Sequence, residues 1–314
     1  MRNKVPVLFI IFNRPELSLE TFRAIKEYQP NVLYIAADGP RSWIDGEAEI
    51  CAYTRQSILE QIDWNCDVHK LFRDKNIGCG LGPSSGISWM FEQEKYGVII
   101  EDDCTPSSDF FRFCEELLPK YADCYQVMQI NGFNPATKRT IGDSYSFSRY
   151  PKIWGWATWK RAWKDFDIKM SVWHDYKKSN KIWKQFPVLE GFVHRYIWER
   201  SFRELNRTER PNFWDIPWSI TIFSRDGLCI VPDVNMVVNT GEGVNATNCI
   251  IVDPNISKLK YGKIEFPLIH PGKIELTKET NQWDQKDYMN RRKSLLKQKI
   301  KRFFKLNTLN IWAR

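Results

Sequence analysis

Short apolar segments alternate with amphipathic segments along the first part of the chain. The apolar segments are rich in branched residues, as buried parallel strands are, and predict strands at 5–12, 31–37, 66–72, 96–100 and 124–130. Between them, apolar residues recur at helical spacing and predict helices over 16–28, 47–61, 87–95 and 108–121. This alternation predicts an α/β fold in which helices cover both faces of a mostly parallel sheet.

The second part of the chain is less regular and richer in aromatic residues. Trp156, Trp159 and Trp163 recur at helical intervals, which predicts one buried face of a helix over 153–167. We expect further helix over 178–206 and a strand over 227–232. A helical, aromatic-rich region should therefore lie beside the sheet.

Polar residues follow four of the predicted strands at the points where these strands end. They are Asn13-Arg14, Asp38-Gly39, Arg73-Asp74 and Glu101-Asp102-Asp103. Because the carboxyl ends of parallel strands meet at one edge, and ligands bind there, we expect these four groups to form one site.

Three consecutive acids end the segment "GVIIEDD". Carboxylates this close repel one another and resist burial unless a cation or several donors compensate them. Carboxylate oxygens suit Mg²⁺ or Mn²⁺, which also bridge to diphosphate oxygens. The alternative is a solvated acidic turn whose negative charge favours the N-terminus of the helix that follows.

The Gly-rich segment "GCGLGPSSG" (78–86) is expected on the same edge of the sheet. It lacks the Lys-Ser/Thr of a P-loop, and its glycines do not match the dinucleotide fingerprint. We expect it to open a helix over 84–95 and to shape a pocket; a plain tight turn is the alternative.

The net charge of +8 is concentrated near the C-terminus, since residues 291–305 hold eight Lys or Arg and no acid. Met289, Leu296, Ile300 and Phe303 share one face of a predicted helix in this segment. A basic amphipathic helix over 286–314 would bind an anionic membrane surface. The alternative is a solvated tail, or a helix packed on the protein's own acidic surface. Nucleic acid is not expected, because no recognised binding module accompanies the charge.

No apolar run approaches the roughly 20 residues that a membrane-spanning helix needs. The eight cysteines show neither a CxxC pair nor zinc-site spacing, which indicates reduced thiols. We therefore expect a cytoplasmic protein, peripheral on the inner face of the membrane if the tail binds there.

Several motifs resemble, in order, those of one protein family. They are "PVLFIIFNRPE", "YIAADGPR", "FRDKNIGCGLGPSSGISWMFE", "GVIIEDDCTPSSDFFRFCEELL", "SRYPKIWGWATWKRAW" and "FWDIPWSITIFSRDGLCIVPDVNMVVNTGEGVNATN". The set, over roughly 5–250, resembles bacterial nucleotide-diphospho-sugar transferases of surface-polysaccharide gene clusters, some labelled haemolysin-type. It is more distantly similar to the N-acetylglucosaminyltransferase I family.

The resemblance implies a GT-A fold and roles for individual residues. Asp103 would hold a Mn²⁺ or Mg²⁺ ion, while Asp102 and Glu101 would contact ribose or metal-bound water. Asp215 would be the catalytic base; from the sequence alone, the alternative is an N-cap of the helix after Pro217. The implied nucleotide-sugar contacts are Asn13, Arg14, Asp38 with Gly39, and Arg73, with Asp38 bonded to the uracil ring.

Aromatic residues near the base are candidates for the acceptor site. Trp154, Trp156 and Trp214 would offer indole faces on which sugars stack.

The implied activity is metal-dependent, inverting transfer of a hexosyl or N-acetylhexosaminyl group. A UDP-sugar is the favoured donor, and a glycan or lipid-linked acceptor of surface-polysaccharide synthesis would receive the sugar. The alternatives are a sugar-nucleotide nucleotidyltransferase, or a non-catalytic glycan- or membrane-binding protein. We expect a catalytic domain over 1–250, divided into a donor half (1–131) and an acceptor half (132–250), then an extension (251–284) and the basic tail (285–314).

Overall fold

The computed structural model describes residues 4–135, 142–241, 259–290 and 292. An eight-stranded sheet forms its centre, in the order β3-β2-β1-β4-β8-β6-β9-β7. Its strands are β1 (Val7–Ile11), β2 (Val32–Ala37), β3 (Asp67–Phe72), β4 (Tyr96–Glu101), β6 (Val127–Asn131), β7 (Tyr145–Ser148), β8 (Trp156–Trp159) and β9 (Leu228–Pro232). Only β8 and β7 run antiparallel to their neighbours in this sheet. A small antiparallel pair, β5 (Cys104–Pro106) with β10 (Val237–Asn239), lies beside it.

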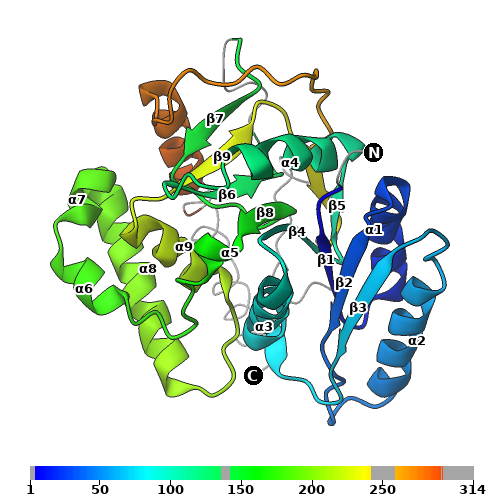
Figure 1. Cartoon of the computed structure of the whole chain (residues 1–314). Helices are drawn as coiled ribbons and strands as arrows, with labels where there is room; N and C mark the ends of the chain where they lie inside the picture. The colour runs from blue at the N-terminus through cyan, green and yellow to red at the C-terminus, as the bar shows by residue number, and fades with distance from the viewer. Residues whose placement is uncertain (1–3, 136–141, 242–258, 291, 293–314) are drawn as a thin grey trace, which may run out of the picture.

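Helices cover both faces of the sheet (Figure 1). Alternate residues of the buried strands point to opposite faces, so β1 contributes Phe9 to one core and Leu8 to the other. The first core packs against α1 (Pro15–Tyr28), α2 (Glu47–Leu59) and α4 (Ser108–Lys120). The second packs against α3 (Gly78–Gln93), α5 (Lys160–Trp163) and α9 (Asp215–Ser224).

A third, aromatic-rich core lies among the helices to the left of the sheet in Figure 1. These helices are α6 (Trp173–Lys178), α7 (Lys181–Gln185) and α8 (Val188–Arg207). The predicted α/β fold is therefore confirmed: the central sheet is mostly parallel, and a helical, aromatic-rich region lies beside it.

The predicted helix over 153–167 is wrong in its first part. Residues 156–159 form β8, and a short helix follows only at Lys160–Trp163. Trp156 packs in the second core and Trp159 in the first, so they lie on opposite faces of the sheet. Because β8 is a central strand covered on both faces, its apolar run gave no alternation to distinguish it from a helix.

The helix α3 begins at Gly78, earlier than the predicted start at 84, so the Gly-rich segment is neither a loop nor a tight turn. Its glycines permit close packing. A Cβ atom on Gly80 would collide with the backbone of Pro211, and one on Gly86 would lie 2.9 Å from Cβ of Ala36. The amide of Gly80 donates to the carbonyl of Pro211 at 3.0 Å.

A helical segment over 278–290 packs on the far end of the sheet, next to β7 and β9 (Figure 1). The hydroxyl of Ser148 donates to buried Asp284 at 2.6 Å. The segment thus continues across the expected boundary between extension and tail. Leu296, Ile300 and Phe303 of the predicted amphipathic face lie outside the described residues.

In the part of the chain that the structure describes, no helix is both long and apolar enough to cross a bilayer. The described cysteines are all free thiols.

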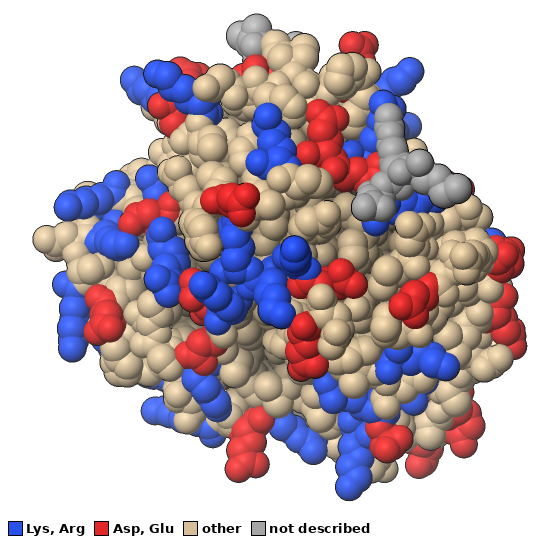
Figure 2. Space-filling view, viewed as in Figure 1, with Lys and Arg blue, Asp and Glu red and all other residues tan. Residues whose placement is uncertain are grey.

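On the face shown in Figure 2, Lys and Arg side chains gather over the left part of the molecule, where α6–α8 lie.

Candidate active site

The ends of four neighbouring strands meet at one edge of the sheet, as the sequence predicts. Ile11 at the end of β1 pairs with Ala37 at the end of β2, and Ala37 pairs with Phe72 at the end of β3. On the other side, Ile10 pairs with Glu101 at the end of β4. The residues that follow these positions therefore emerge together.

Arg14 lies against two of the three consecutive acids. Its guanidinium group forms an ion pair with Asp102, and its Nη1 atom lies 3.1 Å from Oδ2 of Asp103. The side chains of Arg14, Asp102 and Asp103 are 20%, 5% and 17% exposed, so this contact lies in a partly dehydrated place. The cation that faces the acids in this structure therefore belongs to the chain itself.

The acids next to Arg14 resist ionisation. Burial, and then the charges of Asp103 and Asp102, raise the pKa of Glu101 to about 8. Burial also raises the pKa of Asp102 to about 6, although Arg14 opposes the shift. The Oε1 atom of Glu101 is buried with no hydrogen-bond partner among the described residues. The cluster holds more negative charge than Arg14 alone compensates.

Asp103 is also enclosed from the other side by residues that the sequence analysis did not select. The side-chain amide of Asn239 donates to its Oδ1 atom at 3.3 Å, and the amide of Thr240 donates to its carbonyl at 2.8 Å. A Cβ atom on Gly241 would collide with the Asp103 carboxylate. These contacts depend on the pairing of β10 with β5, which no local pattern indicates.

Asn13 is held by the buried carboxylate of Glu47, which pairs with partly exposed Arg41. Its amide donates to Oε1 of Glu47 at 2.8 Å, and Glu47 also binds the guanidinium group and the backbone amide of Arg41. The hydrogen bond from Arg41 is the main cause that lowers the pKa of Glu47. The sequence analysis missed Glu47 and Arg41, which fix the loop after β1.

The carboxylate of Asp38 holds the start of α3. It accepts hydrogen bonds from the backbone amides of Gly39 at 2.9 Å, Ile77 at 3.0 Å and Gly78 at 3.0 Å. Asp38 is thus brought to the expected edge, but its carboxylate is already bonded to backbone there.

Arg73 and Gly39 lie beside Asp38. The guanidinium group of Arg55 donates to the carbonyls of both Asp38 and Arg73, at 3.0 and 2.7 Å. Arg73 itself donates to the hydroxyl of Ser85 at 2.7 Å. Gly39 lies so close to Lys75 that a Cβ atom would collide with its backbone. Arg73 points toward α3, while Arg14 faces the acids.

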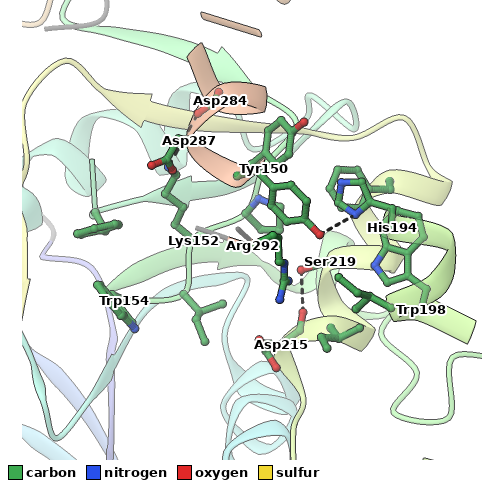
Figure 3. Close-up of a pocket in the computed structure, with 17 residues that line it drawn as sticks. Tyr150, Lys152, Trp154, His194, Trp198, Asp215, Ser219, Asp284, Asp287 and Arg292 are labelled. Carbon is green, nitrogen blue, oxygen red and sulfur yellow. Dashed lines mark hydrogen bonds and ion pairs between the residues drawn. The ribbon is translucent and has the colours of Figure 1, made fainter. Parts of the chain in front are cut away.

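Asp215 is the first residue of α9 and lies on the wall of a pocket of about 290 Å³ (Figure 3). The N-cap position belongs to Trp214, and no side-chain cap hydrogen bond forms. Burial raises the pKa of Asp215, while backbone hydrogen bonds from Ile216 and from Asp215 itself oppose the shift. The charge of Asp215 makes a small contribution to the raised pKa of Glu101.

A polar network joins α8 to the segment 278–290 on the opposite wall of this pocket. Nε2 of His194 donates to Oε1 of Glu190 at 3.2 Å, and the Tyr150 hydroxyl donates to the same oxygen. Nδ1 of His194 then accepts from the Tyr288 hydroxyl at 3.2 Å. Arg292 lies over the Tyr288 ring and points into the pocket (Figure 3). The C-terminal segment thus completes the pocket.

The three candidate acceptor tryptophans do not lie together. Trp154 lines the pocket and packs edge-on against Phe133. Trp156 is fully buried and stacks on buried Trp214, with ring centroids 5.6 Å apart. Of these three residues, only Trp154 is therefore available to a ligand in this pocket. The expectation that Trp156 and Trp214 contact the acceptor is corrected, because both side chains are buried in the second core.

The acids fit a hard divalent cation by their chemistry. Glu101, Asp102 and Asp103 offer carboxylate oxygens. Oε1 of Glu101 is buried without a hydrogen-bond partner among the described residues, so it could accept a bound cation as its partner. No cluster of three ligand side chains occurs among residues 4–135, 142–241, 259–290 and 292.

No protein-family model matches the chain, and no curated protein is similar to it in sequence. Several solved structures are distantly similar. HddC from Yersinia pseudotuberculosis is 8% identical over 52% of this chain and 80% of its own, with a TM-score of 0.31. S. aureus TarS 1-349 is 11% identical over 52% and 49%, with a TM-score of 0.36. Mannosyltransferase PcManGT from Pyrobaculum calidifontis, solved with GDP-Man and Mn²⁺, is 11% identical over 71% and 70%, with a TM-score of 0.37. Likenesses this distant assign neither a family nor an activity.

Proposed function

We propose that this protein is a metal-dependent, inverting glycosyltransferase that moves a sugar from a nucleotide-diphosphate donor to a glycan or lipid-linked acceptor. A UDP-sugar is the favoured donor. The observation that supports this most directly is the contact of Arg14 with Asp102 and Asp103, which brings a cation and adjacent acids together at the carboxyl edge of the sheet. A diphosphate and a metal ion would bind at this edge, and Asp215 would serve as the proton acceptor.

The donor half of the site would comprise the loops after β1, β2 and β4. Arg14 is the basic group nearest the acids, and it is the candidate to bind the diphosphate and stabilise its charge as the bond to the sugar breaks. Asn13, held by Glu47, would contact the nucleotide together with Gly39 and Arg73. Because the Asp38 carboxylate already holds α3, a contact with the base would use its remaining lone pairs.

Asp103 is the residue that we propose for the metal, with Asp102 and Glu101 bound to its waters or to the ribose. When bound, Mn²⁺ or Mg²⁺ would neutralise charge on the leaving diphosphate. Asn239 and the close approach of Gly241 would hold the Asp103 carboxylate in place.

Asp215 would accept the proton of the incoming hydroxyl group. A base is more effective when its pKa lies nearer the working pH, and burial moves the pKa of Asp215 upward in that direction. The acceptor would occupy the pocket beside it, with Trp154 as a stacking surface. We propose the same division into a donor half (1–131) and an acceptor half (132–250), with segment 278–290 added to the acceptor pocket.

Calorimetric titration with UDP, GDP, CMP and dTDP, each with Mn²⁺ and with EDTA, tests the donor site. We expect metal-dependent binding of one diphosphate and its loss in Asp103→Ala. If folded protein binds none of the four, the proposal fails. Incubating the matching nucleotide sugar with the protein and following release of the nucleotide then tests transfer or hydrolysis.

A further inference from the structure

The outer side of α8 exposes an unusual group of apolar side chains. Val188, Leu189, Phe192 and Tyr196 are 58–68% exposed, and they lie on one face of the helix because they recur within one and two turns. Trp183 from α7, 39% exposed, packs against Phe192 with ring centroids 5.0 Å apart. We call these five residues the outer patch.

The outer patch is not simply the edge of a core. The opposite face of α8 is buried and includes Gly191, His194, Trp198 and Leu205, so the helix is already anchored to the protein. A Cβ atom on Gly191 would lie 2.8 Å from the Trp183 ring, which shows how closely α7 and α8 approach there. The exposed apolar residues are therefore held rigidly toward solvent.

Basic residues adjoin the outer patch on the same side of the helix. Arg195, Arg200 and Arg207 are exposed, and in the part of the chain that the structure describes no carboxylate pairs with them. Exposed Lys184 lies beside Trp183 in the chain. Two acids lie among these arginines. Glu199 is bonded to the indole of Trp173 at 2.9 Å and to Arg203 at 2.9 Å, and Glu204 lies between Arg200 and Arg207 in the chain. Figure 2 shows the resulting excess of basic side chains over this part of the molecule.

We propose that the outer patch and its flanking arginines bind an anionic lipid surface. Aromatic and aliphatic side chains that enter the interface, with cations beside them at headgroup level, are the combination such a surface accepts. A second copy of the chain is a poorer occupant, because a two-fold contact would bring the arginines of both copies together. The proposal does not depend on the reaction at the candidate active site, and none of the residues that it uses belongs to 293–314.

Flotation of the full chain with vesicles of phosphatidylcholine alone, or with phosphatidylglycerol added, tests the proposal. We expect binding only to the anionic vesicles. The double substitution Leu189→Ser/Phe192→Ser should weaken that binding about tenfold or more, since two large apolar side chains no longer enter the interface. Ile50→Ser/Tyr53→Ser removes two exposed apolar side chains from α2 and should leave binding unchanged.

The charge is tested separately. Arg200→Gln/Arg207→Gln should reduce binding roughly thirtyfold, because two cations near an anionic surface contribute about 1 kcal/mol each. The matched control is Lys70→Gln/Lys95→Gln, which removes the same charge from exposed positions elsewhere. The proposal is overturned if the wild-type chain does not bind anionic vesicles. It is also overturned if the apolar double variant and the arginine double variant of α8 both bind as tightly as their controls. It is also overturned if light scattering shows that the wild type self-associates through the outer patch and only the α8 variants are monomeric.

Discussion

The Nη1 atom of Arg14 lies 3.1 Å from Oδ2 of Asp103. This contact joins the loop after β1 to the acids after β4, across two strands that pair side by side in the sheet. It means that three consecutive acids at the end of a buried strand are tolerated in the ligand-free chain partly because the protein supplies its own cation. A ligand that takes Arg14 or Asp103 must therefore compete with this ion pair.

Replacing Asp103 by Asn should remove metal-dependent nucleotide binding. The amide keeps the size of the side chain but is a poorer ligand for a hard cation. We expect the dissociation constant of the bound nucleotide to rise about tenfold or more in Mn²⁺, to the value seen with EDTA. Calorimetry measures both values. Asp74→Asn, an exposed acid on the same edge, is the control; equal effects of the two variants would count against Asp103 as the ligand.

Replacing Arg14 by Gln should destabilise the protein even without any ligand. The nearly buried carboxylate of Asp102 would lose its cation, and breaking a buried pair from one side costs about 3 kcal/mol. Urea denaturation in EDTA gives the free energy of unfolding. The double variant Arg14→Gln/Asp102→Asn should regain part of the loss, because no buried charge is then left alone; no difference between wild type and Arg14→Gln would refute the expectation.

Replacing Asp215 by Asn should leave donor binding intact and reduce kcat by a factor of about 10²–10⁴, as expected for loss of a general base. Glu209→Gln changes an exposed carboxylate in the preceding loop and should keep full activity. Unchanged turnover in Asp215→Asn would eliminate it as the base.

The pH dependence of kcat offers an independent check on Asp215. A base acts only when deprotonated, and burial raises the pKa of Asp215 above its ordinary value of 3.8. Activity should therefore fall as the pH decreases, with the midpoint of this acidic limb above 3.8. The limb should be absent from the residual activity of Asp215→Asn, and its persistence there would assign it to another group.

The buried His194 should make the protein less stable in mild acid. Burial lowers its pKa from 6.5, so below that pH the unfolded chain binds a proton that the folded chain resists. The contribution of His194 to the free energy of unfolding should thus decrease as the pH falls through 6.5, while the raised pKa values of Glu101 and Asp102 act in the opposite direction. His194→Gln should flatten this dependence, whereas His174→Gln, an exposed residue, should not; parallel curves for both variants would contradict the assignment.

The glycines of α3 should not tolerate substitution where the backbone of another segment contacts them. Gly80→Ala places a methyl group against Pro211, and we expect a loss of about 1–3 kcal/mol despite the better helix propensity of Ala. Gly272, with nothing within 4 Å of its Cβ position, provides the control. Thermal and urea unfolding of the two Ala variants would measure the difference, and a stabilised Gly80→Ala would show that α3 moves away freely.

The alternation of strands and helices up to β6, and the edge at which the polar residues emerge, could be predicted from the sequence because both follow from local periodicity; β5, β7 and β10 could not. Strand β1 is continuous and apolar, and Asn13 and Arg14 must then emerge where it ends. The same reasoning fails at Trp156, because a strand buried on both faces resembles a buried helix in its composition. It also fails at Gly78, where glycines that normally indicate a loop are used for close packing within α3.

The residues that hold the site residues in place could not be predicted from local sequence patterns. Glu47 reaches Asn13 from the start of α2, and Asn239 reaches Asp103 from a strand far along the chain. Tyr288 also joins His194 from a segment far along the chain. Each contact requires knowledge of which segments pack together, which periodicity within one segment does not contain.

The two faces of α8 share one rigid backbone. His194, Ile197 and Trp198 line the pocket beside Asp215, and Leu189 and Phe192 on the other side meet solvent. A helix moves as a unit, so pressure on its outer side displaces the pocket wall by the same amount. Whatever docks on this helix is thereby mechanically coupled to the pocket beside Asp215, in which we propose that an acceptor lies.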